Sequence, residues 1–353
     1  MYPVIGNAII FGIMSITVET SLGGSDYFWL TLILLVLTGA TTSFFQVSVF
    51  AEASRFPPQY VQAVMSGQGI AGVAVAGSSI ISALAATTKM DTNDPSSINR
   101  SAFIYFLSAL FVTVAALLGR VILSQQAFYL FQMKQEKLVI SDDEDSESSQ
   151  HTTTRPVKQL VKKSMGLIFA VAYVFVVTLM IFPSITALIK SVVRHPPSSD
   201  NTSPTRTTTT SQSRFFDDDI FIAMHFLLFN VGDWVGRVLP LWSSFQTFKS
   251  SLLVIFSLLR TGLIPLFLIC NVVVSRERLL PVLINSDLAY FLLIWIFSVT
   301  NGWVSSLSMM AAPQQTYLRS AAEKSQIGSI MSFALVVGLA IGGCMSFWIR
   351  TLI

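Results

Sequence analysis

The amino-acid sequence predicts an all-α fold, a polytopic membrane helix bundle of about nine transmembrane helices. Two observations predict it. First, only 12% of the 353 residues are charged and 52% are hydrophobic, with a mean hydropathy of +0.65, whereas soluble proteins carry roughly 25% charged residues. Second, the apolar residues occur in long runs, and about 20 such residues form a helix that crosses a bilayer. A helix satisfies its backbone hydrogen bonds internally, as a membrane requires.

Nine uncharged or nearly uncharged runs define the expected spans. Most of these runs have charged residues at their ends, and the helix-breaking pair Pro57-Pro58 lies at the start of the third run. The sixth run contains Asp233 and Arg237, and the seventh contains Arg260. In chain order the expected spans are Met1–Val18, Tyr27–Ala51, Phe56–Thr88, Ser101–Gly119, Ser164–Ile189, Ile220–Phe248, Ser250–Ser275, Leu288–Pro313 and Ser325–Ile349.

Two polar segments divide these spans into domains. Residues 125–163 include an acidic, serine-rich tract at 141–149, and because such a composition cannot bury a core we expect a disordered cytosolic loop. A solvated linker explains the tract more simply than a phosphorylation site does. Residues 191–219 are rich in Ser, Thr and Pro and predict a flexible non-cytosolic loop. The expected domains are a four-span N-terminal bundle, residues 1–124, and a five-span C-terminal bundle, residues 164–353.

The distribution of Lys and Arg near the span ends predicts the orientation of the chain. With residues 125–163 in the cytosol, the N-terminus is also cytosolic and the C-terminus lies on the opposite side. Two possible N-glycosylation motifs, at Asn99 and Asn201, then fall on the non-cytosolic side, which agrees with this orientation. We expect an integral protein of the plasma membrane or of a vacuolar or endosomal membrane.

The composition excludes several classes of site. The two cysteines, Cys270 and Cys344, lie in apolar runs and are too few for a disulfide scaffold or a cysteine metal site. The three histidines lack metal-ligand spacing, and the sequence contains neither a phosphate-binding loop nor a hydrolase nucleophile elbow. A net charge of +3 is too small to indicate nucleic-acid binding. We therefore expect no metal, no cofactor, no nucleic-acid partner and no enzymatic activity.

The strongest candidate site is a pair of charges inside the sixth span. Asp233 and Arg237 lie four residues apart in the motif Phe229-Asn-Val-Gly-Asp-Trp-Val-Gly-Arg237, so both project from one helix face. Asn230, three residues before Asp233, joins that face. Charged residues inside a membrane are costly and usually face a bundle interior or an aqueous cavity. The pair therefore indicates either a pathway for a polar solute or a salt bridge that clamps this helix to a neighbour.

Polar groups in the second and third spans are weaker candidates. Gln46 offers a hydrogen-bond donor and an acceptor together, which suit the edge of a nucleobase or a contact with another helix. The small residues of Met65-Ser-Gly-Gln-Gly69 favour close packing of helices. Within that motif, Gln68 is a candidate for lining a cavity.

Four positions in the later spans are also notable. Pro183, directly after Phe182, predicts a kink in the fifth span, at the border of a cavity or as a plain bend. We expect Arg260 to extend toward the cytosolic interface. A polar patch begins at Asn301 in the eighth span, and His225 is interpreted as a packing residue rather than a catalyst.

Together these features resemble the equilibrative nucleoside transporter family. The resemblance covers nearly the whole chain apart from the loops, and the Asp-Trp-x-Gly-Arg motif is its most specific part. Phe182-Pro183 and the glycine-rich last span also resemble the family. The motifs that carry the resemblance are Gln46 with Pro57, Tyr60 and Met65-Ser-Gly-Gln-Gly69, then Phe229-Asn-x-x-Asp-Trp-x-Gly-Arg237, then Pro265-Leu-Phe with Cys270-Asn271, and finally Asn301-Gly-Trp-x-x-Ser-Leu307.

The resemblance implies a major-facilitator-like fold, in which two helix bundles joined by a cytosolic loop open a central cavity to each side in turn. It implies facilitated diffusion of nucleosides, with nucleobases as an alternative substrate. By this resemblance Gln46 would hydrogen-bond the base, and Asp233 with Arg237 would hold the ribose hydroxyls. Asn230 and Phe182 would complete the wall of the substrate site.

The sequence also departs from the family pattern. The family has eleven spans and this chain has nine expected ones, so we expect an N-terminally shortened member that lacks the first two helices. Thr42 stands where a glycine is usual near Gln46. Two alternatives remain open: a transport-inactive chain that pairs with full-length homologues, and proton-coupled transport through Asp233. The sequence does not predict an oligomeric state.

Overall fold

The computed structural model describes residues 2–19, 24–86, 95–133, 156–196, 216–273 and 281–351. Within these ranges the chain is largely helical, and its only β-structure is a pair of isolated bridges. The predicted all-α fold is therefore confirmed. Residues 134–155 of the expected cytosolic loop and residues 197–215 of the expected non-cytosolic loop, which include Asn201, lie outside the described residues.

In the described residues, four helices belong to the predicted N-terminal bundle: α1 (Tyr2–Glu19), α2 (Gly24–Ala53), α3 (Pro58–Ala86) and α4 (Pro95–Ser124). They occupy the places of the first four expected spans. Pro58 opens α3, since a proline in the first helical turn gives up no intrahelical hydrogen bond. α1 packs against α2 and α4. At the contact with α2, the Asn7 amide donates to Thr42 Oγ1 at 3.0 Å and accepts from the hydroxyl of Thr41.

The predicted C-terminal bundle contains six α-helices in the part of the chain that the structure describes: α6 (Val157–Ile181), α7 (Asp218–Val238), α8 (Ser250–Leu259), α9 (Leu263–Leu268), α10 (Asp287–Ala311) and α11 (Ala321–Arg350). Serine side chains cap two of them. Ser286 accepts from the backbone N–H of Ala289 at the start of α10, and Ser320 accepts from that of Glu323 at the start of α11. Such caps satisfy donors that the first helical turn leaves free.

The sixth and seventh expected spans end earlier than predicted. α7 ends at Val238 rather than at Phe248, and two short 3-10 turns follow. Pro240 explains the end of the helix, because proline has no backbone N–H to donate to a carbonyl one turn earlier. The seventh expected span is broken by the 3-10 turn Arg260–Gly262 into α8 and α9, and α9 ends at Leu268.

The expectation of a disordered loop over residues 125–163 is wrong at both ends. Residues 127–133 form a short helix, bent by 67° from the end of α4, and α6 already begins at Val157. Aromatic packing holds the short helix in place. Its rings stack on those at the junction of α2 and α3, with Phe128 on Tyr60 at 5.7 Å and Tyr129 on Phe56 at 5.9 Å between ring centroids.

The length and hydropathy of the helices match a membrane protein. In the described part of the chain, six helical segments are long and apolar enough to cross a membrane. The bent pair of residues 109–124 and 127–133 is a candidate seventh, and residues 2–17 form a shorter apolar helix. The protein is thus an integral, multi-pass membrane protein, while the count of nine spans stays a prediction.

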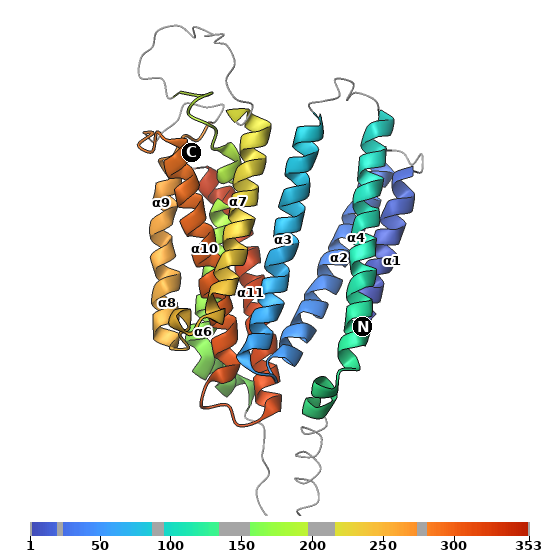
Figure 1. The fold of residues 1–353 in the computed structure, drawn as a ribbon, viewed down its shortest axis with the longest axis vertical. Helices are drawn as coiled ribbons and strands as arrows, with labels where there is room; N and C mark the ends of the chain where they lie inside the picture. Colours follow the sequence, from blue (N-terminus) through green and yellow to red (C-terminus); the bar gives the residue numbers. More distant parts are fainter. Residues whose placement is uncertain are drawn as a thin grey trace, which may run out of the picture.

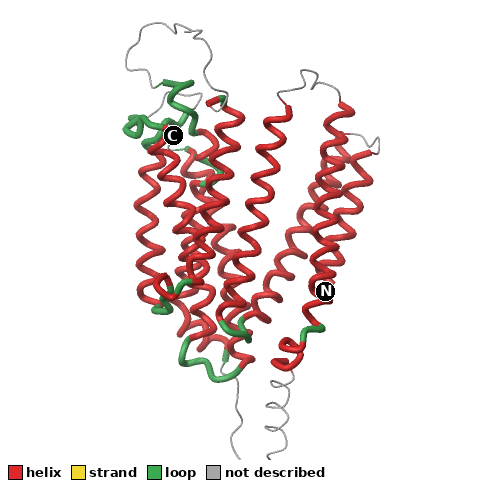
Figure 2. The backbone as a smooth tube through the Cα atoms, viewed as in Figure 1, coloured by secondary structure: helices red, strands yellow, loops and turns green. Residues whose placement is uncertain are grey.

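The helices stand side by side in an elongated assembly (Figures 1 and 2). α3 runs along α7 and also contacts α10, and α2 contacts α11. We call these contacts the α3–α7 seam and the α2–α11 seam; they join the N-terminal bundle to the C-terminal bundle. The α2–α3 turn, the start of α6 and the α10–α11 connection lie at one end of the molecule (bottom of Figure 1). The segments predicted to be cytosolic therefore gather at one end.

The largest apolar core extends across both bundles. Phe50 and Met65 from the N-terminal bundle pack with Leu307, Ile327 and neighbouring residues of the C-terminal bundle, and these four side chains are fully buried. Lipid is as apolar as such side chains, so close packing rather than escape from water holds helices together in a membrane. Helices of both predicted bundles therefore share one apolar core.

Candidate functional site

The charged pair of α7 lies inside the bundle, between α3 and α10. Arg237 donates from Nε to Oδ2 of Asp233 at 2.7 Å, across one helical turn. Each residue has only 7% of its surface exposed. The two side chains therefore share one inward-facing helix surface, as their spacing predicts.

Arg237 also ties α7 to α3. Its Nη1 donates to the backbone carbonyl of Met65 at 3.0 Å and to Oε1 of Gln68 at 3.3 Å, and Gln62 donates to the backbone carbonyl of Arg237 at 3.0 Å. A Cβ atom on Gly69 would lie 3.1 Å from Cδ of Arg237. The small residues of the α3 motif thus bring the backbone of α3 within reach of the guanidinium.

The second oxygen of Asp233 connects the pair to two further helices. Asn301 of α10 donates from Nδ2 to Oδ1 of Asp233 at 2.6 Å, and Thr178 of α6 donates to Oδ1 of Asn301 at 2.6 Å. Asn301 and Thr178 are 2% and 3% exposed. The sequence analysis noted Asn301 as the start of a polar patch and as part of a family motif, but not as a partner of Asp233, because that contact depends on how α7 and α10 pack. An amide within an apolar span was the available indication.

The prediction that Arg260 extends to the interface is wrong. Arg260 is 2% exposed and donates to the backbone carbonyl of Phe297 and to the hydroxyl of Thr178, both at 2.8 Å. It follows the first residue of α8 by ten positions, or about 15 Å of helix, so its side chain lies too deep to reach the interface. Together the side chains of five residues form what we call the buried polar network: Arg260, Thr178, Asn301, Asp233 and Arg237.

Asn230 and Phe182 lie near this network without bonding to the Asp233 carboxylate. Asn230 donates to the backbone carbonyl of Phe226 at 2.8 Å, and its side chain lies against Gly72 of α3. Phe182, directly after α6, stacks on Phe229 with the ring centroids 3.8 Å apart. Both residues are half-buried. The ring of Phe182 and the amide of Asn230 thus lie along the part of α7 that precedes Asp233.

Gln46 lies on the other seam. Its Nε2 donates to Oγ of Ser332 in α11 at 3.4 Å, and the residue is half-buried. The structure thus brings Asp233, Arg237 and Asn230 onto one helix surface but places Gln46 in a separate contact between the two bundles. Thr42, one turn earlier on α2, is exposed and bonds to Asn7.

Comparison with known proteins assigns the chain to a family. A family model described as Nucleoside transporter matches residues 32–351. The chain belongs to the nucleoside transporter family. The match covers every residue of the buried polar network and Gln46, and it agrees with the resemblance seen in the sequence motifs.

Two relatives of this nucleoside transporter family member align with nearly the whole chain, and a third aligns with about a third of it. Equilibrative nucleoside transporter 1 of Homo sapiens is 29% identical, and that of Rattus norvegicus 28% identical; each alignment covers 98% of this chain and 74% of the relative. Nucleoside transporter FUN26 of Saccharomyces cerevisiae is 38% identical over 36% of this chain and 25% of its own length.

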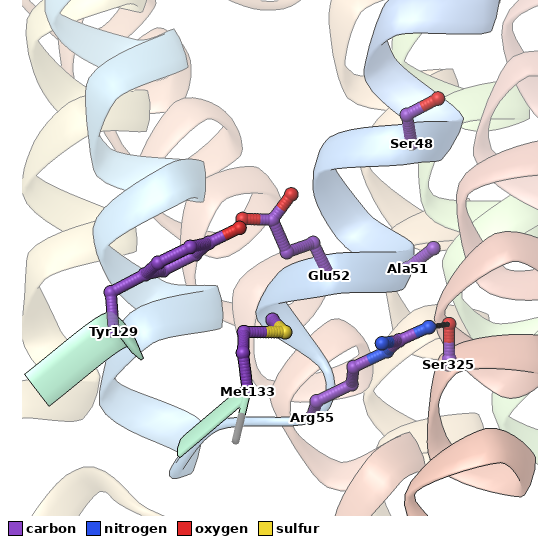
Figure 3. A pocket seen from close by; sticks show the side chains of 7 residues that line it. All are labelled: Ser48, Ala51, Glu52, Arg55, Tyr129, Met133 and Ser325. Atoms are coloured by element: carbon purple, nitrogen blue, oxygen red, sulfur yellow. Dashed lines mark hydrogen bonds between the residues drawn. The ribbon is translucent and has the colours of Figure 1, made fainter. Parts of the chain in front are cut away.

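A polar pocket lies at the end of the transporter that is predicted to be cytosolic (Figure 3). It has a volume of about 350 Å³ and is lined by Ser48, Ala51, Glu52, Arg55, Tyr129, Met133 and Ser325. Arg55 donates to Ser325 of α11 at 3.4 Å, and Glu52 forms a two-pronged ion pair with Arg120 of α4 at 2.5 and 2.7 Å. The sequence analysis did not predict a role for Glu52 or Arg55 in a site, because their partners are far away along the chain.

Proposed function

We propose that this protein carries nucleosides across its membrane by facilitated diffusion, through alternating access of one site to the two sides. Its family membership and its equilibrative relatives support the substrate class. The observation that carries the proposal is the buried Asp233–Arg237 pair at the seam between the two bundles. Ionisable groups at such positions typically mark the pathway of a polar solute.

The carboxylate of Asp233 retains capacity for a substrate. An ionised carboxylate has about four acceptor positions, and the protein fills two of them, with Asn301 on one oxygen and Arg237 on the other. We propose that ribose hydroxyls donate to the remaining positions while the guanidinium of Arg237 donates to ribose oxygens. Nucleosides are the preferred substrates in this arrangement, and free nucleobases would lack these contacts.

The base is assigned to Gln46, whose amide can donate and accept at once. Asn230 and the ring of Phe182 would form the remaining wall of the site. Gln46 belongs to the N-terminal bundle and the ribose contacts belong to the C-terminal bundle. A nucleoside held by both would therefore couple its own binding to movement of one bundle against the other.

The same contacts explain how the seam would open. In this conformation the guanidinium of Arg237 donates two hydrogen bonds to α3, one to Met65 and one to Gln68. A substrate oxygen can replace these neutral acceptors without leaving the guanidinium unsatisfied. Exchange of protein acceptors for substrate acceptors would remove these two contacts of the guanidinium with α3 at little loss of hydrogen bonding.

The test is uptake of labelled uridine by proteoliposomes that contain the purified chain. We expect Asp233→Ala and Arg237→Ala each to abolish uptake, since either change leaves its partner buried and unpaired. A matched control is Arg194→Ala, which breaks the exposed ion pair with Asp217 outside the network. Wild-type uptake by both network variants would contradict the assignment, and uptake that requires a pH gradient would contradict facilitated diffusion.

We further propose that the protein lies in the plasma membrane or in a vacuolar or endosomal membrane. Asn99 lies in the first turns of α4, and Asn201 lies outside the described residues. Loss of a glycosidase-sensitive mobility shift in Asn99→Gln or Asn201→Gln would place that residue on the non-cytosolic side. A shift that survives both changes would contradict glycosylation at these motifs.

A further inference from the structure

A second arginine lies deep in the bundle without a carboxylate of its own. In the described part of the chain, Arg260 forms no ion pair, and its Nε has no hydrogen-bond partner. Its guanidinium lies over the ring of Phe297, 4.7 Å from the ring centroid. A buried charge held only by neutral groups is expensive in a membrane, and an apolar side chain of similar volume would pack there at lower cost. Stability alone therefore does not explain the guanidinium at this position.

The remaining donors of Arg260 point at acceptors on α6 and α10. Nη1 donates to the carbonyl of Phe297 at 2.8 Å and to the hydroxyl of Thr300 at 2.5 Å. Nη2 donates to the hydroxyl of Thr178 at 2.8 Å and lies 3.5 Å from Oδ1 of Asn301. The Thr178 hydroxyl, which accepts from the guanidinium, then has two acceptors for its own proton: Oδ1 of Asn301 at 2.6 Å and the backbone carbonyl of Val174 at 2.8 Å.

The direction of the Thr178 proton determines how the Asn301 amide is turned. Because the Thr178 oxygen accepts from Arg260, its proton is free to go to Oδ1 of Asn301, which at 2.6 Å is nearer than the carbonyl of Val174. With the carbonyl end of the amide held by two donors, the NH₂ end faces Oδ1 of Asp233, at 2.6 Å. A flipped amide would direct its oxygen at the carboxylate, where no proton is available for a hydrogen bond.

We propose that Arg260 is a positioning residue, which acts through Thr178 to hold the Asn301 amide as a donor to Asp233 and so aims the carboxylate at the ribose hydroxyls. The inference rests on the proposed function, in which Asp233 binds ribose. It extends the site to α6 and to the 3-10 turn after α8, two segments that would not touch the sugar. The series of hydrogen bonds Arg260–Thr178–Asn301–Asp233 then determines the preference for ribose over a sugar that lacks the 2′ and 3′ hydroxyls.

The test compares uridine with 2′,3′-dideoxyuridine in proteoliposomes, because the second substrate lacks the hydroxyls that Asp233 would bind. Thr178→Val removes the bridging hydroxyl at nearly constant volume, and Thr178→Ser is the matched control that keeps it. Arg260→Lys is an independent variant, since an ammonium keeps the charge but cannot reproduce the planar fork. Asp233→Asn tests the underlying ribose contact.

For Thr178→Val and Arg260→Lys we expect KM for uridine to rise about tenfold, the effect of one misdirected buried hydrogen bond. The maximal rate for uridine and all parameters for dideoxyuridine should stay within about twofold of wild type. Thr178→Ser should keep the wild-type ratio of the two substrates. A merely structural role would instead lower the uptake of both substrates together.

Equal losses for both substrates, or an unchanged uridine preference in Thr178→Val, would overturn the positioning role. If Asp233→Asn lowers uridine preference while Thr178→Val does not, the proposed function stands and this inference fails. If Asp233→Asn itself keeps the preference, the ribose contact is wrong and the inference falls with it. Should Arg260→Lys not be recovered from membranes, Thr178→Val alone decides, because it removes only one hydroxyl.

Discussion

At the scale of single residues, the charges inside the membrane divide into those that the sequence could place and those that it could not. The four-residue spacing of Asp233 and Arg237 predicts their shared surface, because helix geometry is local. The setting of Arg260 depends instead on where the seventh span breaks and on which oxygens α6 and α10 present to it. Long-range partners of this kind cannot be derived from spacing along one helix.

Gln46 gives a prediction at this scale. We expect Gln46→Leu to raise KM for uridine about tenfold, because the base would lose a donor and an acceptor while the apolar contacts remain. The same change removes the hydrogen bond to Ser332, whose length of 3.4 Å marks it as weak. Concentration dependence of uridine uptake in proteoliposomes measures the effect.

Two controls accompany this change. Ser332→Ala removes the partner hydroxyl and keeps Gln46, so its KM should stay within about twofold of wild type. Gln59→Leu alters an exposed glutamine at the start of α3 and should have no effect. A wild-type KM in Gln46→Leu would exclude Gln46 from base recognition.

At the scale of helices, glycines decide how closely the elements that carry the network approach each other. A Cβ atom on Gly302 would collide with the backbone carbonyl of Asp233 and lie 2.8 Å from the backbone N of Arg237. α10 can therefore bring Asn301 to the carboxylate only because the next residue has no side chain. The sequence indicates such a close approach through its small residues, but not which helix is the partner.

Gly302→Ala should therefore separate α10 from α7. We expect a loss of about 1–3 kcal/mol in stability, the usual cost of overpacking, together with strongly reduced uridine uptake as Asn301 moves away from Asp233. Thermal unfolding in detergent and uptake in proteoliposomes measure the two effects. Gly343→Ala in α11 is the matched control, since a Cβ atom there meets nothing within 4 Å. Equal unfolding temperatures for the two variants would contradict the close contact.

The ion pair between Glu52 and Arg120 leads to a prediction about the stability of the contact between α2 and α4. The two side chains are 23% and 32% exposed, so solvent screening limits the pair to about 0.2–1 kcal/mol. A double-mutant cycle of Glu52→Gln and Arg120→Gln, read by thermal unfolding, should give a coupling energy in that range. Uridine uptake should persist in all three variants, because the pair joins helices of one bundle. Additive effects of the two changes would show that the pair contributes nothing.

At the scale of the whole molecule, the order of the helices is the feature that the sequence predicts best, while the division into two bundles stays a prediction. Apolar runs and polar segments gave the order of the helices, and the described helices follow that order. Helix ends at Val238 and Leu268 were missed because they depend on single prolines and turns inside apolar runs. The two seams could not be predicted from the sequence either. Packing between the bundles decides which face of α3 meets α7.

The α2–α11 seam supplies the last prediction, which concerns movement of the two bundles. Arg55 and Ser325 lie across this seam at the end predicted to be cytosolic, joined by a hydrogen bond of 3.4 Å. If nucleosides pass by alternating access, this end must open in each cycle. A covalent link between positions 55 and 325 should therefore stop uptake. In a chain with Cys270→Ala and Cys344→Ser, the variants Arg55→Cys and Ser325→Cys can be joined by a short bifunctional methanethiosulfonate.

The matched control joins two positions within one bundle. Ser164 of α6 and Tyr317 of the α10–α11 connection lie at the same end, with their hydroxyl oxygens 2.6 Å apart. Ser164→Cys with Tyr317→Cys, linked by the same reagent, should keep uridine uptake, because rigid-body rocking leaves distances inside a bundle unchanged. Reduction should restore uptake in the seam-linked chain. Full uptake by the linked 55–325 chain would mean that this end stays closed during transport, and the solute would then need a route that does not separate α2 from α11.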